Sequence, residues 1–163
     1  MTRTLFAVVS ALAVTGCGTS VSSPDVAGYQ QSVSALQAAV VTHQNDAAST
    51  VTSQDCTAEH RRYEDLARPQ LELMTNMSGG MDDCGRAMGH DGPFELSSMC
   101  GSMRDELDRH AAAACTGDAT ANHAEAAHHC QLMRDWLARE QAGVDSLTTS
   151  MRGGMMSGGR CSR

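Results

Sequence analysis

The segment His123–Met133, HAEAAHHCQLM, carries three histidines, a cysteine and a methionine within an alanine-rich stretch. Imidazole, thiolate and thioether groups all bind transition metals. On a helix, His123 and Cys130 lie within about 20° of each other, whereas His128 and His129 are rotated from His123 by about 140° and 120° in opposite directions. We therefore expect His123 to face partner helices, His129 to flank that face, and His128 to point into solvent.

Two more histidines lie on the apolar stripes of other predicted helices. His60 is near the start of one helix and His110 near the end of the next. If successive helices run antiparallel, His60, His110 and His123 all lie about 6 to 8 Å from one end of a bundle. Converging imidazoles can bind a transition metal, with Glu59 or Glu106 as hydrogen-bond acceptors behind them. The alternative is a hydrogen-bonded polar layer that holds no metal.

The elements that must position these residues are four helices. Apolar residues recur in alternating steps of three and four, as they do on helices of a bundle. The first of these stripes includes His43, and Pro69 predicts a kink or a break in the second helix. The connection 78–93 is long and rich in glycine and methionine. We expect an all-α, up-down antiparallel four-helix bundle with this long loop between the second and third helices; the predicted helices cover about 23–51, 56–77, 94–114 and 118–151.

Methionines gather around that predicted loop. Met74, Met77 and Met81, followed by His90, are candidates for a second, looser metal site at the other end of the bundle. The thioether is neutral and prefers Cu(I). The M-x-x-M spacing next to glycine resembles the methionine-rich copper-binding stretches of periplasmic copper proteins. The resemblance implies copper as the cofactor, with zinc as the second choice; alternatively, the methionines only fill gaps in the core.

The N-terminus has the layout of an export signal. Arg3 precedes an apolar run over 5–14, and small residues lead to Cys17. The sequence Val14-Thr15-Gly16-Cys17 resembles the lipobox of bacterial lipoproteins. That resemblance implies a signal peptide over 1–16 and a lipidated Cys17. The sequence that follows predicts a polar tether over 17–22, the bundle over 23–152 and a Gly/Met-rich tail over 153–163. The lipobox resemblance also implies attachment to the membrane of the bacterial envelope through a lipid anchor such as palmitate, and Gly18 favours the outer membrane, facing the periplasm.

Six cysteines follow Cys17, and an even number in an exported chain predicts three disulfides with fifteen possible connectivities. Positions along the predicted helices select among them. Cys56 and Cys115 fall at the same end of the bundle, and Cys100 and Cys130 fall at similar distances from that end. The expected pairs are Cys56–Cys115, Cys100–Cys130 and Cys84–Cys161. A cysteine left unpaired would instead indicate a thiol redox role.

Composition narrows the function further. The chain has 12 Lys and Arg, 19 Asp and Glu, and a formal net charge of −7, which argues against nucleic acid as a partner. The motifs C-x-x-C-H, H-E-x-x-H and G-x-S-x-G do not occur in the sequence, and we do not expect an enzyme. We expect an envelope lipoprotein that binds a transition metal as a buffer or resistance component. The alternative is a structural or partner-binding lipoprotein, with an unknown protein partner, that disulfides stabilise.

Overall fold

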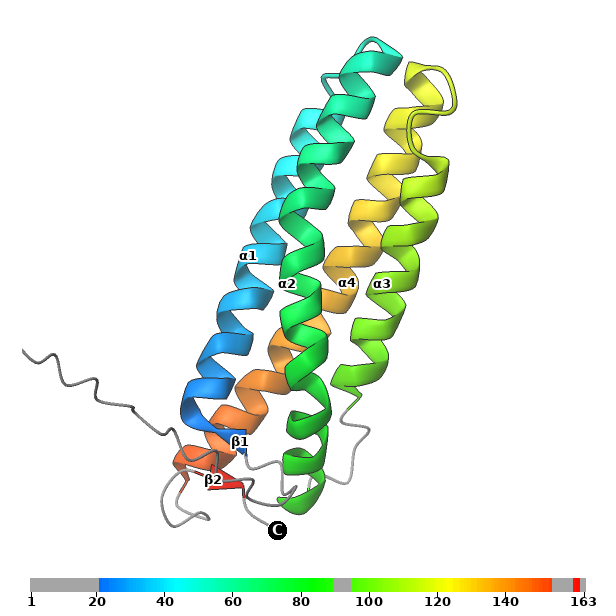
Figure 1. Ribbon diagram of the computed structural model, residues 1–163. Helices are drawn as coiled ribbons and strands as arrows, with labels where there is room; N and C mark the ends of the chain where they lie inside the picture. The colour runs from blue at the N-terminus through cyan, green and yellow to red at the C-terminus, as the bar shows by residue number, and fades with distance from the viewer. Residues whose placement is uncertain (1–20, 90–94, 154–159, 162–163) are drawn as a thin grey trace, which may run out of the picture.

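Four helices make up nearly all of the described chain. A computed structural model of the protein describes residues 21–89, 95–153 and 160–161, with the backbone alone described at 22–24 and 160–161. Helices α1 and α2 form the first antiparallel pair, and α3 and α4 form the second (Figure 1). Their bounds are Ser23–Ala47 for α1, Ser53–Ala87 for α2, Leu96–Ala113 for α3 and Ala119–Arg152 for α4.

The helices pack as an up-down bundle, as predicted. Each helix lies against its neighbours in the sequence, and α1 also packs against α4, so the four close into a ring (Figure 1). Apolar residues of all four helices fill the centre, where Leu36, Met74, Leu107 and Leu137 are almost entirely inaccessible to solvent. The short α1–α2 and α3–α4 turns place the end of α1, the start of α2, the end of α3 and the start of α4 at one end of the bundle.

The predicted loop over 78–93 is wrong for most of its length. Helix α2 continues through the glycine- and methionine-rich segment as far as Ala87, and it also passes without a break through Pro69. Met81 and Cys84 are buried in the core and Met77 packs against it, which stabilises a segment of low helix propensity. Tertiary packing therefore overrides local composition in this part of α2.

Side-chain caps fix where the helices begin. Thr52 accepts a hydrogen bond from the Asp55 amide at the start of α2, and Asp118 caps α4 in the same way. The start of α3 is capped by a residue of another helix, because the buried carboxylate of Asp82 on α2 accepts hydrogen bonds from the amides of Leu96 and Ser97. This long-range cap fixes the height of α3 against α2.

Two short strands lie at the far end of the bundle, β1 over Val21–Ser22 and β2 over Arg160–Cys161. They pair antiparallel, with Val21 opposite Cys161. Val21 is buried beside Gly80 of α2, where an added β-carbon would come within 3.1 Å of the valine side chain. Within the described residues, none of the helices combines the length and hydrophobicity of a membrane span.

Candidate metal centre

Four buried histidines, one from each helix, meet near the end of the bundle that carries the two short turns. They are His43 of α1, His60 of α2, His110 of α3 and His129 of α4, and we call them the histidine layer. The rings of His110 and His129 stack with their centroids 4.0 Å apart, and those of His60 and His110 are 4.9 Å apart. One ring nitrogen from each of His43, His60 and His110 lies within 4.8 Å of the other two. This group could hold a metal ion.

Carboxylates orient two of these three rings. His43 Nδ1 is 2.8 Å from Glu59 Oε1, and His110 Nδ1 is 3.1 Å from Glu125 Oε1. Arg109 binds Glu125 at 2.8 Å, and the hydrogen bonds from Arg109 and His110 lower the pKa of Glu125 even though partial burial acts to raise it. Both pairs match the carboxylate–histidine arrangement behind metal ligands, in which the second ring nitrogen is left to bind the ion.

The facing nitrogens of these two rings need either a shared proton or a bound cation between them. An ionised carboxylate only accepts hydrogen bonds, so His43 and His110 each donate from Nδ1, and each neutral ring then carries a lone pair on Nε2. These two Nε2 atoms face each other at 3.1 Å. Burial and the neighbouring His129 lower the pKa of His110 to about 3, so the His110 ring does not supply that proton as an imidazolium. A metal ion also satisfies both lone pairs, since two ligands of a tetrahedral site with bonds of about 2.0–2.1 Å lie about 3.3 Å apart.

His60 supplies the third imidazole and makes no hydrogen bond. Both of its ring nitrogens are buried without a partner. Its Nε2 is 3.6 Å from Glu64 Oε2, which is within reach of an ion pair but too long for a hydrogen bond. Burial lowers the pKa of His60, so the ring is held neutral with a free lone pair. Buried polar groups without partners are uncommon and costly, and a bound ion would satisfy this one.

His129, by contrast, is fully hydrogen-bonded. Its Nδ1 is 3.0 Å from Glu106 and its Nε2 is 2.9 Å from the Tyr63 hydroxyl, which donates to it. Tyr63 also stacks on His43 with the ring centroids 4.1 Å apart. Burial lowers the pKa of His129 to about 3, so this ring too is neutral. His129 and Tyr63 therefore pack against the rings of His110 and His43 and fix their orientation.

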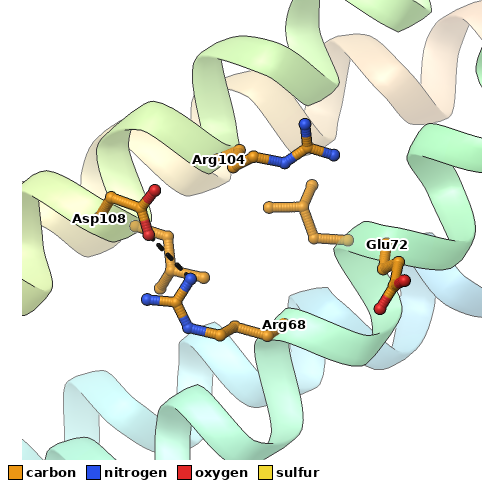
Figure 2. A pocket seen from close by; sticks show the side chains of 6 residues that line it. Arg68, Glu72, Arg104 and Asp108 are labelled. Carbon is orange, nitrogen blue, oxygen red and sulfur yellow. Dashed lines mark hydrogen bonds and ion pairs between the residues drawn. The ribbon is translucent and has the colours of Figure 1, made fainter.

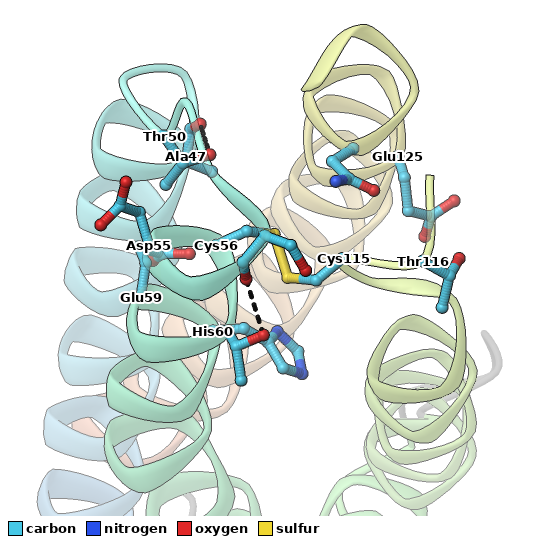
Figure 3. Close-up of a disulfide and its surroundings, with 12 residues drawn as sticks. Ala47, Thr50, Asp55, Cys56, Glu59, His60, Cys115, Thr116 and Glu125 are labelled. Carbon is cyan, nitrogen blue, oxygen red and sulfur yellow. Dashed lines mark hydrogen bonds between the residues drawn. A yellow bond between two sulfur atoms is a disulfide. The ribbon is translucent and has the colours of Figure 1, made fainter. Parts of the chain in front are cut away.

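A small cavity separates these histidines from a disulfide at the end of the bundle. Its volume is about 10 Å³, enough for roughly one water molecule, and its lining includes His43, His60, His110, Cys56 and Cys115. The disulfide Cys56–Cys115 is present as predicted, with its Cα atoms 5.6 Å apart. Figure 3 shows it bridging the start of α2 and the turn after α3, with His60 one turn deeper.

The sequence-based ligand set is partly wrong. His60 and His110 meet as predicted, but His123 does not join them, because its Nε2 binds the carbonyl oxygen of Thr50 nearer the end of the bundle. Helix α4 begins beyond the end of α3, so His129, and not His123, lies level with His110. His43 is the third member of the group in place of His123.

The methionines of the predicted thioether site lie on helix α2 and not in a flexible loop. Met74 and Met81 lie in the hydrophobic core with no exposed surface, and Met77 packs against that core. Their helix places them on a buried face of α2, which is the gap-filling role of methionine. His90, the fourth predicted member, lies outside the described residues.

The predicted Cys100–Cys130 disulfide is also wrong, since both residues are buried free thiols. Cys100 faces Glu140 across the bundle, with Sγ 3.6 Å from Oε1. Cys130 lies ten residues before Glu140, about 15 Å away along α4. Burial raises the pKa of Cys100 to about 12 and that of Cys130 to about 11, so neither thiol is a ready nucleophile. Cys84 is disulfide-bonded, and its predicted pairing with Cys161 falls on a side chain outside the described residues.

A second buried polar group surrounds Glu140. The Tyr29 hydroxyl donates to Glu140 Oε2 at 2.6 Å, and the Cys100 thiol contacts the other carboxylate oxygen. Glu140 has no exposed surface, and burial raises its pKa to about 7. The Tyr29–Cys100–Glu140 group is internally satisfied and lies on the far side of Cys130 from the histidine layer, so we assign it to the core.

The raised pKa of Glu140 predicts a dependence of stability on pH. From pH 4.5 to about 7 the folded protein keeps a proton that the unfolded chain releases, so stability falls as pH rises through this window, by at most about 3 kcal/mol. Glu140→Gln stays neutral and should exceed the wild type in stability above pH 7 while matching it near pH 4.5. Urea unfolding across this range measures the difference, and parallel pH profiles for the two proteins would contradict the assignment.

A larger pocket lies elsewhere, on the surface between α2 and α3. It has a volume of about 330 Å³ (Figure 2). Its charged side chains largely satisfy one another or their neighbours. Arg68 binds Asp108 at 2.8 Å and Glu64 at 2.6 Å, and Arg104 donates to Thr75. The pocket therefore lacks a group of unpaired, metal-binding atoms like the ring nitrogens of the histidine layer. Its lining consists of Arg68, Leu71, Glu72, Arg104, Leu107 and Asp108.

Comparison of the chain with protein-family models, with curated protein sequences and with solved structures finds no match. The function must therefore be inferred from the geometry of the histidine layer itself.

Proposed function

We propose that this protein is a metal-binding lipoprotein of the bacterial envelope that holds a transition-metal ion, copper in the first place, between His43, His60 and His110. The observation that carries this proposal is the arrangement of lone pairs. Two carboxylate-paired imidazoles face each other through Nε2 at 3.1 Å, and a third buried imidazole beside them has no hydrogen-bond partner. A bound cation would accept one lone pair from each of the three rings at once.

The donor set supports copper or zinc. Three neutral imidazoles suit either ion, and copper binds a given nitrogen site more tightly than zinc does. Glu59 and Glu125 would offset the charge of a divalent ion through the rings that they orient. The metal would supply a Lewis acid with one coordination position open to the cavity.

The size of the cavity supports storage or buffering. A volume of about 10 Å³ beside the three rings has room for roughly one water molecule next to a bound ion but for no organic substrate. The Cys56–Cys115 disulfide lines this cavity and joins the start of α2 to the turn after α3 beside the site. We therefore propose a buffer or resistance component and not an enzyme. The lipobox-like sequence ending at Cys17 supports its location in the envelope.

A titration tests the function directly. The purified, oxidised protein should bind one Cu(II), Cu(I) or Zn(II) ion, and an ion at 100 times its dissociation constant should stabilise the fold by about 2.7 kcal/mol. His43→Ala/His60→Ala/His110→Ala should abolish this effect, whereas His123→Ala should retain it. Equal binding by the triple variant would contradict the proposal. Elemental analysis of protein isolated from envelope membranes then identifies the resident ion.

Removing an orienting carboxylate should weaken binding without abolishing it. We expect Glu125→Gln to reduce metal affinity by about 10–100-fold, because His110 loses the partner that fixes its tautomer and ring orientation. Glu72→Gln, on an exposed part of the same bundle, is the matched control and should bind like the wild type. Competition with a chelator of known affinity measures both variants; an unchanged affinity in Glu125→Gln would mean that His110 is not a ligand.

One observation favours a second candidate, a purely structural polar layer. His129 satisfies both of its ring nitrogens through Glu106 and Tyr63 without any metal. If all four histidines were hydrogen-bonded in this way, neither metal nor chelator would change the melting temperature of the protein. The titration above separates the two candidates.

A further inference from the structure

The Cys56–Cys115 disulfide lines the same cavity as His43, His60 and His110. We propose that reduction of this disulfide creates a second kind of metal site, in which the thiolates of Cys56 and Cys115 bind the ion together with imidazoles of the layer. This inference rests on the proposed binding of metal by the histidines, and it adds a class of ligand that the oxidised protein does not present.

The two cysteines reach the cavity from different elements of the fold. Cys56 precedes His60 by one helical turn on the same face of α2, and Figure 3 shows the imidazole one turn below the disulfide. Cys115 follows His110 by five residues and belongs to the turn between α3 and α4. Reduction would therefore place one thiol from α2 and one from this turn at the mouth of the histidine site.

The turn that carries Cys115 can change conformation once the disulfide opens. Cys115 has φ = 61°, in the left-handed region that is unfavourable for a residue with a β-carbon. It lies outside both helices, so its backbone is not fixed by helical hydrogen bonds. Cleavage of the disulfide removes a covalent restraint on this strained residue, which allows its sulfur to move toward the cavity.

The chemistry balances with a dithiol as the reductant. The reductant gives two electrons and two protons, the S–S bond of Cys56–Cys115 breaks, two thiols form, and the reductant becomes a disulfide. When a divalent ion binds, each thiol releases its proton to solvent and coordinates as a thiolate. Two thiolates with two imidazoles complete a tetrahedral set, whereas the oxidised site has three imidazoles and an open position. Reduction should tighten binding and oxidation should loosen it.

The test compares the oxidised and reduced forms of the full protein. Dithiothreitol is used for reduction and then removed without air, and each form is titrated with Co(II) alone and with Zn(II) against a chelator. Reduced wild type should show an intense sulfur-to-cobalt charge-transfer band and a Zn(II) affinity at least about 100-fold above that of the oxidised form. Cys56→Ser/Cys115→Ser, which keeps every other cysteine, should show neither change on reduction.

Several results would overturn the inference. A band of equal intensity in the double variant would assign the thiolates to other cysteines. Binding in both forms with no band and no gain in affinity would remove the thiolate site but leave the histidine site intact. Failure of the oxidised protein to bind any ion would instead refute the proposed function. Circular dichroism should show a helical reduced protein; a loss of helix that Zn(II) does not restore also counts against the thiolate site.

Discussion

His60→Leu is expected to make the metal-free protein more stable, by about 1–3 kcal/mol, and to remove its stabilisation by copper or zinc. The gain has a simple cause. His60 is buried with both ring nitrogens unpaired, so its desolvation is not compensated in the metal-free state. Leucine fills a similar volume without polar atoms. A residue that costs stability in the absence of its ligand and is needed in its presence is the signature of a binding site.

His129→Leu is the matched control and should have the opposite sign. It makes the same substitution in the same layer, but it removes the hydrogen bonds of His129 to Glu106 and Tyr63. Leaving these buried groups without partners should destabilise the protein by about 1–3 kcal/mol or more. Urea unfolding with and without metal measures both variants. If His60→Leu destabilises the metal-free protein as much as His129→Leu does, the histidine layer is structural.

Cys56→Ser/Cys115→Ser should lower the free energy of unfolding by about 4 kcal/mol, because the disulfide joins residues 59 positions apart and restricts the unfolded chain. For a chain of 163 residues, this corresponds to a fall of about 8–16 °C in melting temperature. Cys84 is also disulfide-bonded, and under non-reducing conditions its disulfide should remain intact in the variant. The change should therefore report on the end of the bundle that carries the histidine layer.

Cys130→Ser controls for the loss of a buried sulfur, since Cys130 is a free thiol in the core. Cys130→Ser should lower the free energy of unfolding much less than the double variant does. The denaturant m-value gives an independent check, because an unfolded chain without the cross-link is more expanded and the m-value should rise. A small loss of stability with an unchanged m-value would contradict a loop-closing role for the disulfide.

The all-α bundle could be predicted because four stripes of alternating three- and four-residue steps fix four amphipathic helices. The Cys56–Cys115 bond could also be predicted, because both residues lie next to turns at the same end. A disulfide between residues next to turns can be predicted even if the position of a helix along the bundle axis is wrong by a few residues. Composition alone misled at 78–87, where the burial of Met81 and Cys84 keeps a glycine-rich segment helical.

The histidine layer could be predicted only in part, because its membership depends on the relative heights of the helices. His60 and His110 were correct, since they lie on central stripes near the turns. His43 lies on the apolar stripe of α1, near the same end of the bundle as His60 and His110. An up-down topology was therefore enough to predict that His43 belongs to the layer. His129 was underestimated because the buried stripe of a core helix is wider than a single line of residues. The height of α4 against α3 decided between His123 and His129, and it also separated Cys100 from Cys130.

The arrangement of lone pairs could not have been predicted from the sequence. It depends on which nitrogen of each ring faces a carboxylate and on the 3.1 Å distance between the Nε2 atoms of His43 and His110. Side-chain rotamers and packing set both features. The surplus of carboxylates in the composition was consistent with many other arrangements.

Anomalous diffraction from crystals of the oxidised protein soaked with Cu(II) or Zn(II) tests the central claim most directly. We expect one strong anomalous peak about 2.0–2.1 Å from a ring nitrogen of each of His43, His60 and His110. No peak there in crystals whose soaked metal lies only on surface residues such as His128 would contradict it, and the layer would then be a hydrogen-bonded core and nothing more.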